Sequence, residues 1–310
     1  MKLATTIGIV LPYTIDMLDA VRLCAKSEFK YLDYSFDTSE RMRMLVSENW
    51  TGDFALTLSE AERHGMKFIQ AHAPSFNPLA NNIPYDVGML MLNRSIEACS
   101  YLGIPNIVVH AGYSNEYLIT RPEDYKSFCE CAKNFYCALL PALEKFNVTL
   151  LVENSAHANM GEKQFFFRGS ELAEFIDEVG SEHIKACWDT GHANLDKSNQ
   201  YDDIMALGDR LYSIHVHDNF SGKDNHLPPF IGSLDADGLM QGLIDSGYKG
   251  YFTFEASLLR YKRDKNPPPN MYNRGNGSLK HPSAALALAT LNYLYATGKY
   301  MLESYGCFEE

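Results

Sequence analysis

Histidine and acidic residues recur in short motifs along most of the chain. The motifs are Gln70-Ala71-His72, Val109-His110-Ala111, Val152-Glu153-Asn154, Asp189-Thr190-Gly191-His192, His215-Val216-His217-Asp218, Asp224-Asn225-His226 and Phe254-Glu255-Ala256. Imidazole and carboxylate groups hold divalent metal ions and transfer protons. Each such residue alone is more often a hydrogen-bonded or ion-paired structural residue. Their joint recurrence predicts a metal site.

These motifs end or follow short apolar, β-branched or aromatic segments that predict β-strands. The eight segments are residues 5–10, 31–36, 67–72, 106–110, 148–153, 184–189, 211–217 and 251–255. Helical patterns lie between them and after the last, at 15–26, 56–64, 85–102, 122–146, 170–179, 201–207, 236–246 and 283–303. Eight strand–helix units in series predict an α/β fold with a closed (β/α)8 TIM barrel.

A closed barrel would bring the motifs together at one end of the fold. Active sites of such barrels lie at the carboxyl ends of the strands. Six consecutive predicted strands, the third to the eighth, each bring a His, Asp or Glu to that end. His217 lies two residues after His215, so it points to the same side of its strand. It is predicted to contact the substrate or to support the ligands.

Length and composition favour a single domain spanning residues 1–310. A barrel of this kind takes about 250 residues, which leaves room for long loops after strands 5 and 8. The loop at 154–169 contains three consecutive phenylalanines, 165–167, predicted to cover the site or to contact a second subunit in a homo-oligomer. The loop at 257–282 is rich in basic residues and proline. It is either a solvated arm or a phosphate clamp.

The charge balance limits the partners. The chain has 27 basic and 39 acidic residues, a formal charge of −12, and 46% hydrophobic residues. This composition excludes a disordered, collagen-like or coiled-coil chain and disfavours a nucleic-acid partner. No apolar run approaches the roughly 18 residues of a membrane span. Seven cysteines without framework spacing favour a reducing compartment, so a cytoplasmic location is predicted.

The order of the motifs along the chain and their local sequences resemble the xylose-isomerase-like barrel superfamily over nearly the whole chain. That superfamily includes sugar isomerases and epimerases as well as endonuclease IV. In the epimerase branch four ligands hold one metal ion, and the resemblance places them at Glu153, Asp189, His215 and Glu255. It also implies that Glu153 and Glu255 act as an acid–base pair on either side of a bound sugar.

Endonuclease IV instead holds three zinc ions with nine ligands. The additional five would be His72, His110, His192, Asp224 and His226, and all five positions are filled. Two features depart from that enzyme. His217 stands where an amide is expected, and its DNA-intercalating loops are not identifiable in this chain.

Charge counting separates the two arrangements. One divalent ion among the four epimerase-type ligands leaves a net charge of about −1, which suits a neutral sugar. Three ions with Asp224 added leave about +2, which suits a phosphate and a metal-activated water. With one ion, His72, His110, His192, His217, Asp224 and His226 would bind the substrate.

Three functions follow, in order. The first is a divalent-metal-dependent isomerase or epimerase of a sugar or sugar phosphate, using Mn, Co, Mg or Zn in carbohydrate metabolism. The second is an endonuclease-IV-like phosphodiesterase with up to three zinc ions. The third is a metal-dependent carbohydrate lyase or dehydratase on the same barrel. Fold alone does not decide among them.

Overall fold

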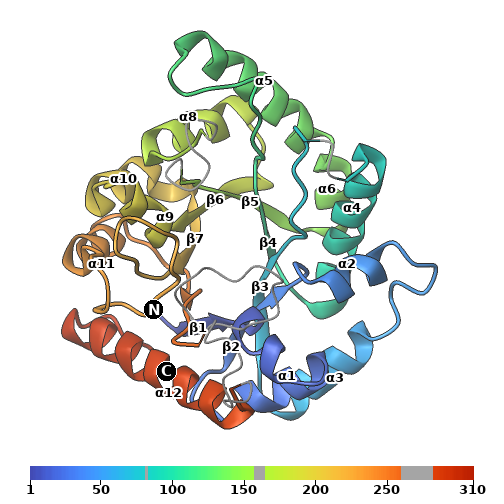
Figure 1. Ribbon diagram of the computed structural model, residues 1–310, viewed down its shortest axis with the longest axis vertical. Coiled ribbons are helices and arrows are strands. Elements are labelled where there is room, and N and C mark those ends of the chain that lie inside the picture. Colours follow the sequence, from blue (N-terminus) through green and yellow to red (C-terminus); the bar gives the residue numbers. More distant parts are fainter. Residues whose placement is uncertain (81–82, 157–164, 260–281) are drawn as a thin grey trace, which may run out of the picture.

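Eight parallel strands close into a barrel in chain order, with β1 paired to β8 (Figure 1). The computed structural model describes residues 1–80, 83–156, 165–259 and 282–310. The strands are β1 (Leu3–Thr6), β2 (Tyr31–Ser35), β3 (Lys67–His72), β4 (Asn106–Val109), β5 (Thr149–Glu153), β6 (Ile184–Asp189), β7 (Leu211–Val216) and β8 (Phe252–Phe254). The predicted (β/α)8 TIM barrel is confirmed.

Helices surround the barrel and cover its outer face (Figure 1). They are α1 (Met17–Cys24), α2 (Ser39–Leu45), α3 (Phe54–Arg63), α4 (Tyr85–Leu102), α5 (Pro122–Cys137), α6 (Leu140–Phe146), α8 (Gly169–Val179), α9 (Thr190–Leu195), α10 (Gln200–Leu207), α11 (Ala236–Asp245) and α12 (Ala284–Ser304). Within the described ranges, none of the helices is both long and apolar enough to span a membrane. All seven cysteines are free, as their spacing predicts.

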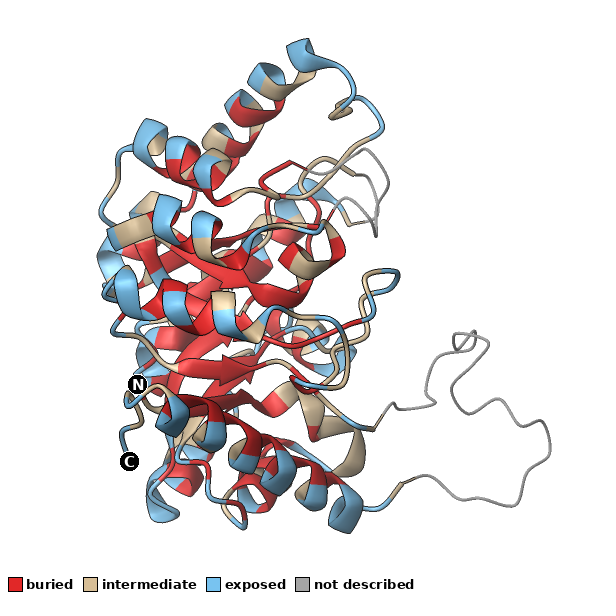
Figure 2. Ribbon diagram, turned by 90° about the vertical axis from the view of Figure 1, so that its left-hand side faces the viewer, coloured by how far each residue is buried: buried red, intermediate tan, exposed pale blue. Residues whose placement is uncertain are grey.

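Burial is greatest in the strands and on the inner faces of the helices (Figure 2). Alternate strand residues point outward and join one large core with the helices. Val108, Leu151 and Cys187 form a separate small cluster inside the barrel. Glu153 and Asp189 lie two residues beyond Leu151 and Cys187 and therefore share their inward direction. The barrel interior thus has an apolar layer with a charged layer at its carboxyl end.

Two predicted elements were wrong in extent. The first strand ends at Thr6, and Ile7–Ile9 forms a 3₁₀ helix whose first turn is capped by the Thr6 side chain, which accepts from Gly8 N–H. The helix predicted over 122–146 is two helices, α5 and α6. Pro141 lies in the first turn of α6, where its missing N–H is tolerated, whereas in a continuous helix its ring would clash with the preceding turn.

Two short helices were not predicted, and one of them carries a site residue. In α9, Asp189 is the N-cap, and its side chain accepts from the His192 N–H at 2.6 Å. This local hydrogen bond stabilises a helix directly after the strand. In α2 the N-cap is Thr38. Both helices are shorter than two and a half turns, so periodicity alone gives a weak signal for them.

The phenylalanine segment was predicted to cover the site or contact another subunit, and for two of its residues this was wrong. Phe165 and Phe166 are buried, 4% and 0% exposed. Their rings pack on Phe128 of α5, with centroids 4.7 and 5.2 Å away. Phe166 also packs on Phe175 of α8. They belong to the core because Phe128 of α5 and Phe175 of α8 supply the aromatic surfaces on which they pack. Phe165 and Phe166 therefore give no support to the predicted homo-oligomer.

Parts of both long loops lie outside the described residues. These are residues 157–164 of the first loop and 260–281 of the second. The basic strip of the second loop falls entirely in this range: Arg260, Lys262, Arg263, Lys265 and Arg274.

We predict that Gly169→Ala destabilises the fold. Gly169 begins α8, and a Cβ there would lie 2.1 Å from the backbone carbonyl oxygen of Asp203 in α10. The two helices would have to separate, at a cost of about 1–3 kcal/mol in the free energy of unfolding. Urea denaturation measures the free energy of unfolding of each variant. The matched control is Gly222→Ala, whose nearest atom is 4.0 Å away, and which should change stability by less than about 0.5 kcal/mol. Equal stability of the two variants would contradict the prediction.

Candidate metal centre and substrate pocket

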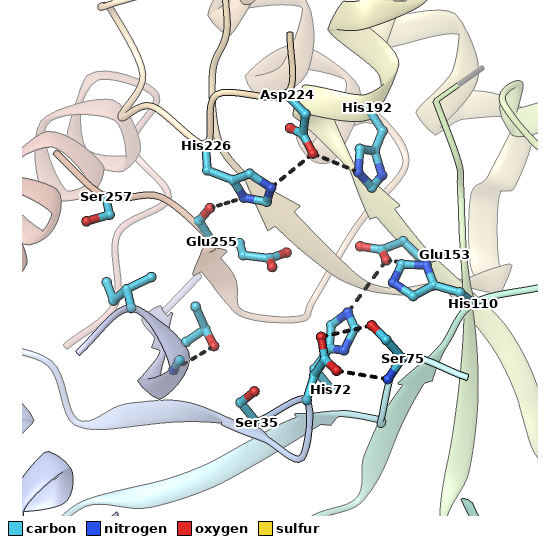
Figure 3. Close-up of a pocket in the computed structure, with 14 residues that line it drawn as sticks. Ser35, His72, Ser75, His110, Glu153, His192, Asp224, His226, Glu255 and Ser257 are labelled. Atoms are coloured by element: carbon cyan, nitrogen blue, oxygen red, sulfur yellow. Dashed lines mark hydrogen bonds and ion pairs between the residues drawn. The ribbon is translucent and has the colours of Figure 1, made fainter. Parts of the chain in front are cut away.

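A pocket of about 340 Å³ opens at the carboxyl ends of the strands (Figure 3). Its lining residues are Thr6, Gly8, Ile9, Ser35, Asp37, His72, Ser75, His110, Glu153, His192, Asp224, His226, Glu255 and Ser257. Most of the sequence-predicted site residues are among them. The others, Asp189, His215 and His217, are fully buried and contact the lining residues from behind.

Four residues from neighbouring strands form a central cluster: Glu153, Asp189, His215 and Glu255. One oxygen or nitrogen atom from each lies within 4.8 Å of those from the other three. His215 Nδ1 lies 2.5 Å from Glu153 Oε1 and 3.1 Å from Glu255 Oε2. Asp189 is in register with His215 across β6 and β7. The structure therefore brings together the four residues that the family resemblance selected.

A histidine pair lies on one side of the central cluster. Nδ1 of His110 is 3.2 Å from Glu153 Oε2, and Nε2 of His72 is 3.9 Å from the same oxygen. These three residues form a second group able to hold a cation.

An acid–histidine group lies on the other side. Asp224 Oδ2 is 3.1 Å from His226 Nε2 and 3.6 Å from His192 Nε2 (Figure 3). All the predicted site residues thus lie at one end of the barrel. The central cluster lies in the middle, with the histidine pair on one flank and the acid–histidine group on the other.

Three pocket histidines are oriented in the same way. In each, Nδ1 lies against a backbone carbonyl oxygen, in the pairs His72–Ala73 (3.0 Å), His192–Asn154 (2.9 Å) and His226–Glu255 (2.8 Å). A carbonyl oxygen only accepts, so Nδ1 carries the hydrogen and donates it. In the neutral ring the lone pair is then on Nε2. Backbone contacts therefore fix the nitrogen that each ring offers to a ligand.

A buried polar group behind His215 was missed from the sequence. His215 Nε2 lies 3.2 Å from Asp33 Oδ2, and Gln70 Nε2 donates to that oxygen at 2.9 Å. The Ser213 hydroxyl donates to Gln70 Oε1. A carboxylate behind an imidazole fixes the ring and raises its basicity as a ligand. The available signal was the two-residue period, because Gln70 precedes His72 by two positions on its strand.

Asn154 is a second residue whose role was missed. Its Nδ2 donates to the Asp189 carbonyl at 2.9 Å, and its Oδ1 accepts from the Asp189 N–H at 2.5 Å. The side chain therefore binds both backbone groups of Asp189 and fixes this residue relative to β5.

The electrostatics of the pocket favour ionised side chains, with negatively charged carboxylates beside positively charged histidines. Burial alone would raise the pKa of Glu153, but His215 and His110 outweigh it and hold that pKa well below its usual range. Burial opposes a charge on His215, yet Cys187, Glu255 and Glu153 together raise its pKa well above the usual value. The pKa of His226 rises to about 9 despite burial, first through its hydrogen bond to Asp224. The acidic groups thus stabilise positive charge in the pocket.

The residues present fit a divalent cation. Glu153 Oε2 is buried and, within the described part of the chain, accepts no hydrogen bond; its near neighbour is His110 Nδ1, an ion-pair contact at 3.2 Å. Such an oxygen is costly to bury unless a cation or a donor meets it. The central cluster offers three carboxylates and one imidazole, a set that zinc, manganese, cobalt or magnesium accepts.

Fold and site together define a (β/α)8-barrel protein with a histidine- and carboxylate-lined pocket at the carboxyl ends of its strands. The chain belongs to the xylose isomerase-like TIM barrel family, whose model matches residues 21–280.

Related sequences match parts of the chain. A D-psicose 3-epimerase from Enterocloster bolteae is 37% identical over 90 residues, 29% of this chain and 28% of that protein. A probable endonuclease 4 from Staphylococcus saprophyticus is 24% identical over 201 residues, 57% of this chain and 62% of that protein. The alignments therefore cover less than two thirds of either relative.

Solved structures match nearly the whole chain in fold. A D-tagatose 3-epimerase-like protein superposes with a TM-score of 0.71 at 18% identity, covering 99% of this chain and 100% of that one. The IolI protein with a bound zinc atom gives 0.72 at 16% identity, covering 98% and 99%. At these identities the likeness shows the shared barrel.

We predict that cation binding by the metal-free protein tightens as pH rises. A ring nitrogen binds a cation only after losing its proton, and the pKa of His215, the imidazole of the central cluster, is raised well above its usual value. Below that pKa, the displaced proton weakens the apparent affinity for the cation about tenfold per pH unit of acidification. Calorimetric titration with Co²⁺ between about pH 6.5 and 8, in buffers of different ionisation enthalpy, measures affinity and protons released. An affinity independent of pH, with no proton release, would contradict it.

Proposed function

We propose that the protein is a divalent-metal-dependent isomerase or epimerase of a sugar, acting by proton transfer next to a carbonyl. The observation that carries the proposal is the central cluster, in which Glu153 and Glu255 both approach His215 Nδ1 at the pocket floor. The epimerases among its relatives and structural neighbours support the same class of reaction.

The metal would be held by Glu153, Asp189, His215 and Glu255. When bound, it would supply positive charge next to the carbonyl and hydroxyl oxygens of the substrate, where negative charge develops during proton removal. Asp33 would keep His215 oriented from behind, and Asn154 would do the same for Asp189.

Glu153 and Glu255 would move the proton. Glu153 is ionised at neutral pH, and its side chain is almost fully buried. The Glu255 side chain is one quarter exposed and lines the pocket. Carboxylates supplied by different strands can address a substrate carbon from different directions. One takes the proton and the other returns it, which inverts the configuration of that carbon.

The rest of the pocket suits a carbohydrate. Ser35, Ser75 and Ser257 line it with hydroxyl groups (Figure 3), and Thr6 adds another. Such groups exchange hydrogen bonds with the hydroxyls of a polyol. With a single ion bound, the ring nitrogens of His72, His192 and His226 would exchange hydrogen bonds with the substrate hydroxyls.

A trinuclear phosphodiesterase is the second candidate. The flanking groups favour it, because His72, His110 and Glu153 on one side could hold a further ion, and on the other side Asp224 lies between His192 and His226. A probable endonuclease 4 among the relatives favours it as well. The acidic composition of the chain argues against a nucleic-acid substrate.

We predict that Glu255→Gln abolishes epimerisation. The amide keeps the size of the side chain but cannot take up the proton, so turnover of a responsive ketose should fall by about 10²–10⁴. Exchange of the substrate's carbon-bound proton with deuterated solvent, followed by NMR across a panel of ketoses, measures this step directly. Glu62→Gln, at an exposed position of α3, is the matched control. Normal exchange in Glu255→Gln would refute the acid–base pair.

Metal content separates the two candidates. We expect one divalent ion per chain in protein purified without chelator, measured by elemental analysis, together with activity on a ketose and none on an abasic-site duplex. About three zinc ions with cleavage of the duplex would establish the phosphodiesterase instead. Absence of metal even after soaking would refute both.

A further inference from the structure

His217 connects the central cluster to one flank without touching the pocket. Its side chain is fully buried, and it does not line the cavity. Its Nε2 lies 3.0 Å from the Asp189 carboxylate. A carboxylate only accepts, so Nε2 donates the hydrogen bond. The backbone is held on both sides by the Thr190 hydroxyl, which accepts from the His217 N–H at 3.1 Å and donates to its carbonyl at 2.9 Å.

Toward the loop, His217 makes a ring stack, and its Nδ1 lies 3.8 Å from Asp224 Oδ1. Its imidazole lies on that of His226, with centroids 4.0 Å apart and planes 14° from parallel. Stacked rings direct their lone pairs side by side instead of toward one point, which makes His217 and His226 a poor pair of ligands to a single ion. The stack is a packing contact.

The space for this ring depends on Gly191. A Cβ at that position would lie 1.9 Å from His217 Cε1. No side chain fits there. The glycine in the Asp189-Thr190-Gly191-His192 motif is therefore required by the volume of the ring.

The loop that carries Asp224 and His226 is seated through this stack. At its base, Asp218 and Leu227 exchange two backbone hydrogen bonds of 2.6 and 2.8 Å. His226 has a positive φ of 46°, an uncommon conformation for a non-glycine residue that persists only where surrounding contacts hold it. The Ser257 N–H donates to its carbonyl at 2.8 Å. The His226 ring is further held by its Nδ1 hydrogen bond to the Glu255 carbonyl and by the stack on His217.

We propose that His217 is a positioning residue with two separable roles. Its Nε2–H orients Asp189 in the central cluster, and its ring seats the loop that presents Asp224 and His226 to the substrate. The first role rests on the proposed function, because it matters through metal binding. The second is a property of the fold and does not depend on any metal. A single side chain thus sets the metal-binding and substrate-binding parts of the pocket relative to each other.

Two substitutions separate these roles. His217→Gln places an N–H near the position of Nε2 but removes the ring, and His217→Phe keeps an aromatic ring but removes the donor. For His217→Gln we expect a Co²⁺ dissociation constant within about threefold of the original protein, with amide hydrogen exchange across 219–227 at least about tenfold faster. For His217→Phe we expect affinity about 10–100-fold weaker, with loop exchange unchanged.

The control is His64→Gln, the same substitution on the surface of the protein, which should leave both measurements unchanged. The proposal is overturned if the loop exchanges normally in His217→Gln, or if both measurements change together in each variant. Should His217→Phe fail to fold beside Gly191, His217→Gln decides alone: unchanged loop exchange or lost Co²⁺ binding overturns the proposal. If the original protein binds no Co²⁺, the proposed function fails, and loop exchange still tests the stack.

Discussion

Alternation along parallel strands in a closed barrel is the constraint on which the site depends. Every second side chain points inward, and at the carboxyl end the inward residues of adjacent strands meet in one small volume. Glu153, Asp189 and His215 occupy this layer, with Leu151 and Cys187 one layer below. Charged groups packed this closely must neutralise one another or bind a cation, since isolated buried charges are prohibitively costly. The mixture of acids and imidazoles follows from that requirement.

Orientation within the charged layer comes largely from the backbone and from a set of neutral side chains. Carbonyl oxygens fix one nitrogen on each of three pocket histidines, and Asn154 clasps both backbone groups of Asp189. Gln70 supports the carboxylate behind His215. These partners lie in or next to the strands of the barrel. A site held in this way is preorganised, and catalysis benefits because the groups need little rearrangement when charge develops.

The chain belongs to the xylose isomerase-like TIM barrel family, and its partial matches to a D-psicose 3-epimerase and to a probable endonuclease 4 agree with the layout of this site. One central cluster is enough for proton transfer on a sugar, whereas the two flanks add groups that phosphate chemistry would use. The choice between them depends on how many ions enter and on what fills the pocket. Fold does not determine either quantity. The hydroxyl-lined wall and the acidic chain favour the sugar.

The amino-acid sequence by itself determined the barrel, the end of the barrel that carries the site and most of the charged residues found there, but not Asp33 or Asp37. Hydrophobic alternation is local, and parallel topology then places every strand end on the same rim. Only the tertiary structure decided which partners those residues have. Asp33 lies 182 positions from the His215 ring that it orients, and nothing in the local pattern near either residue encodes that contact. The burial of Phe165 and Phe166 and the stack of His217 on His226 likewise depend on surfaces supplied by distant segments. Periodicity specifies the direction of a side chain, whereas its partner is set by packing between elements.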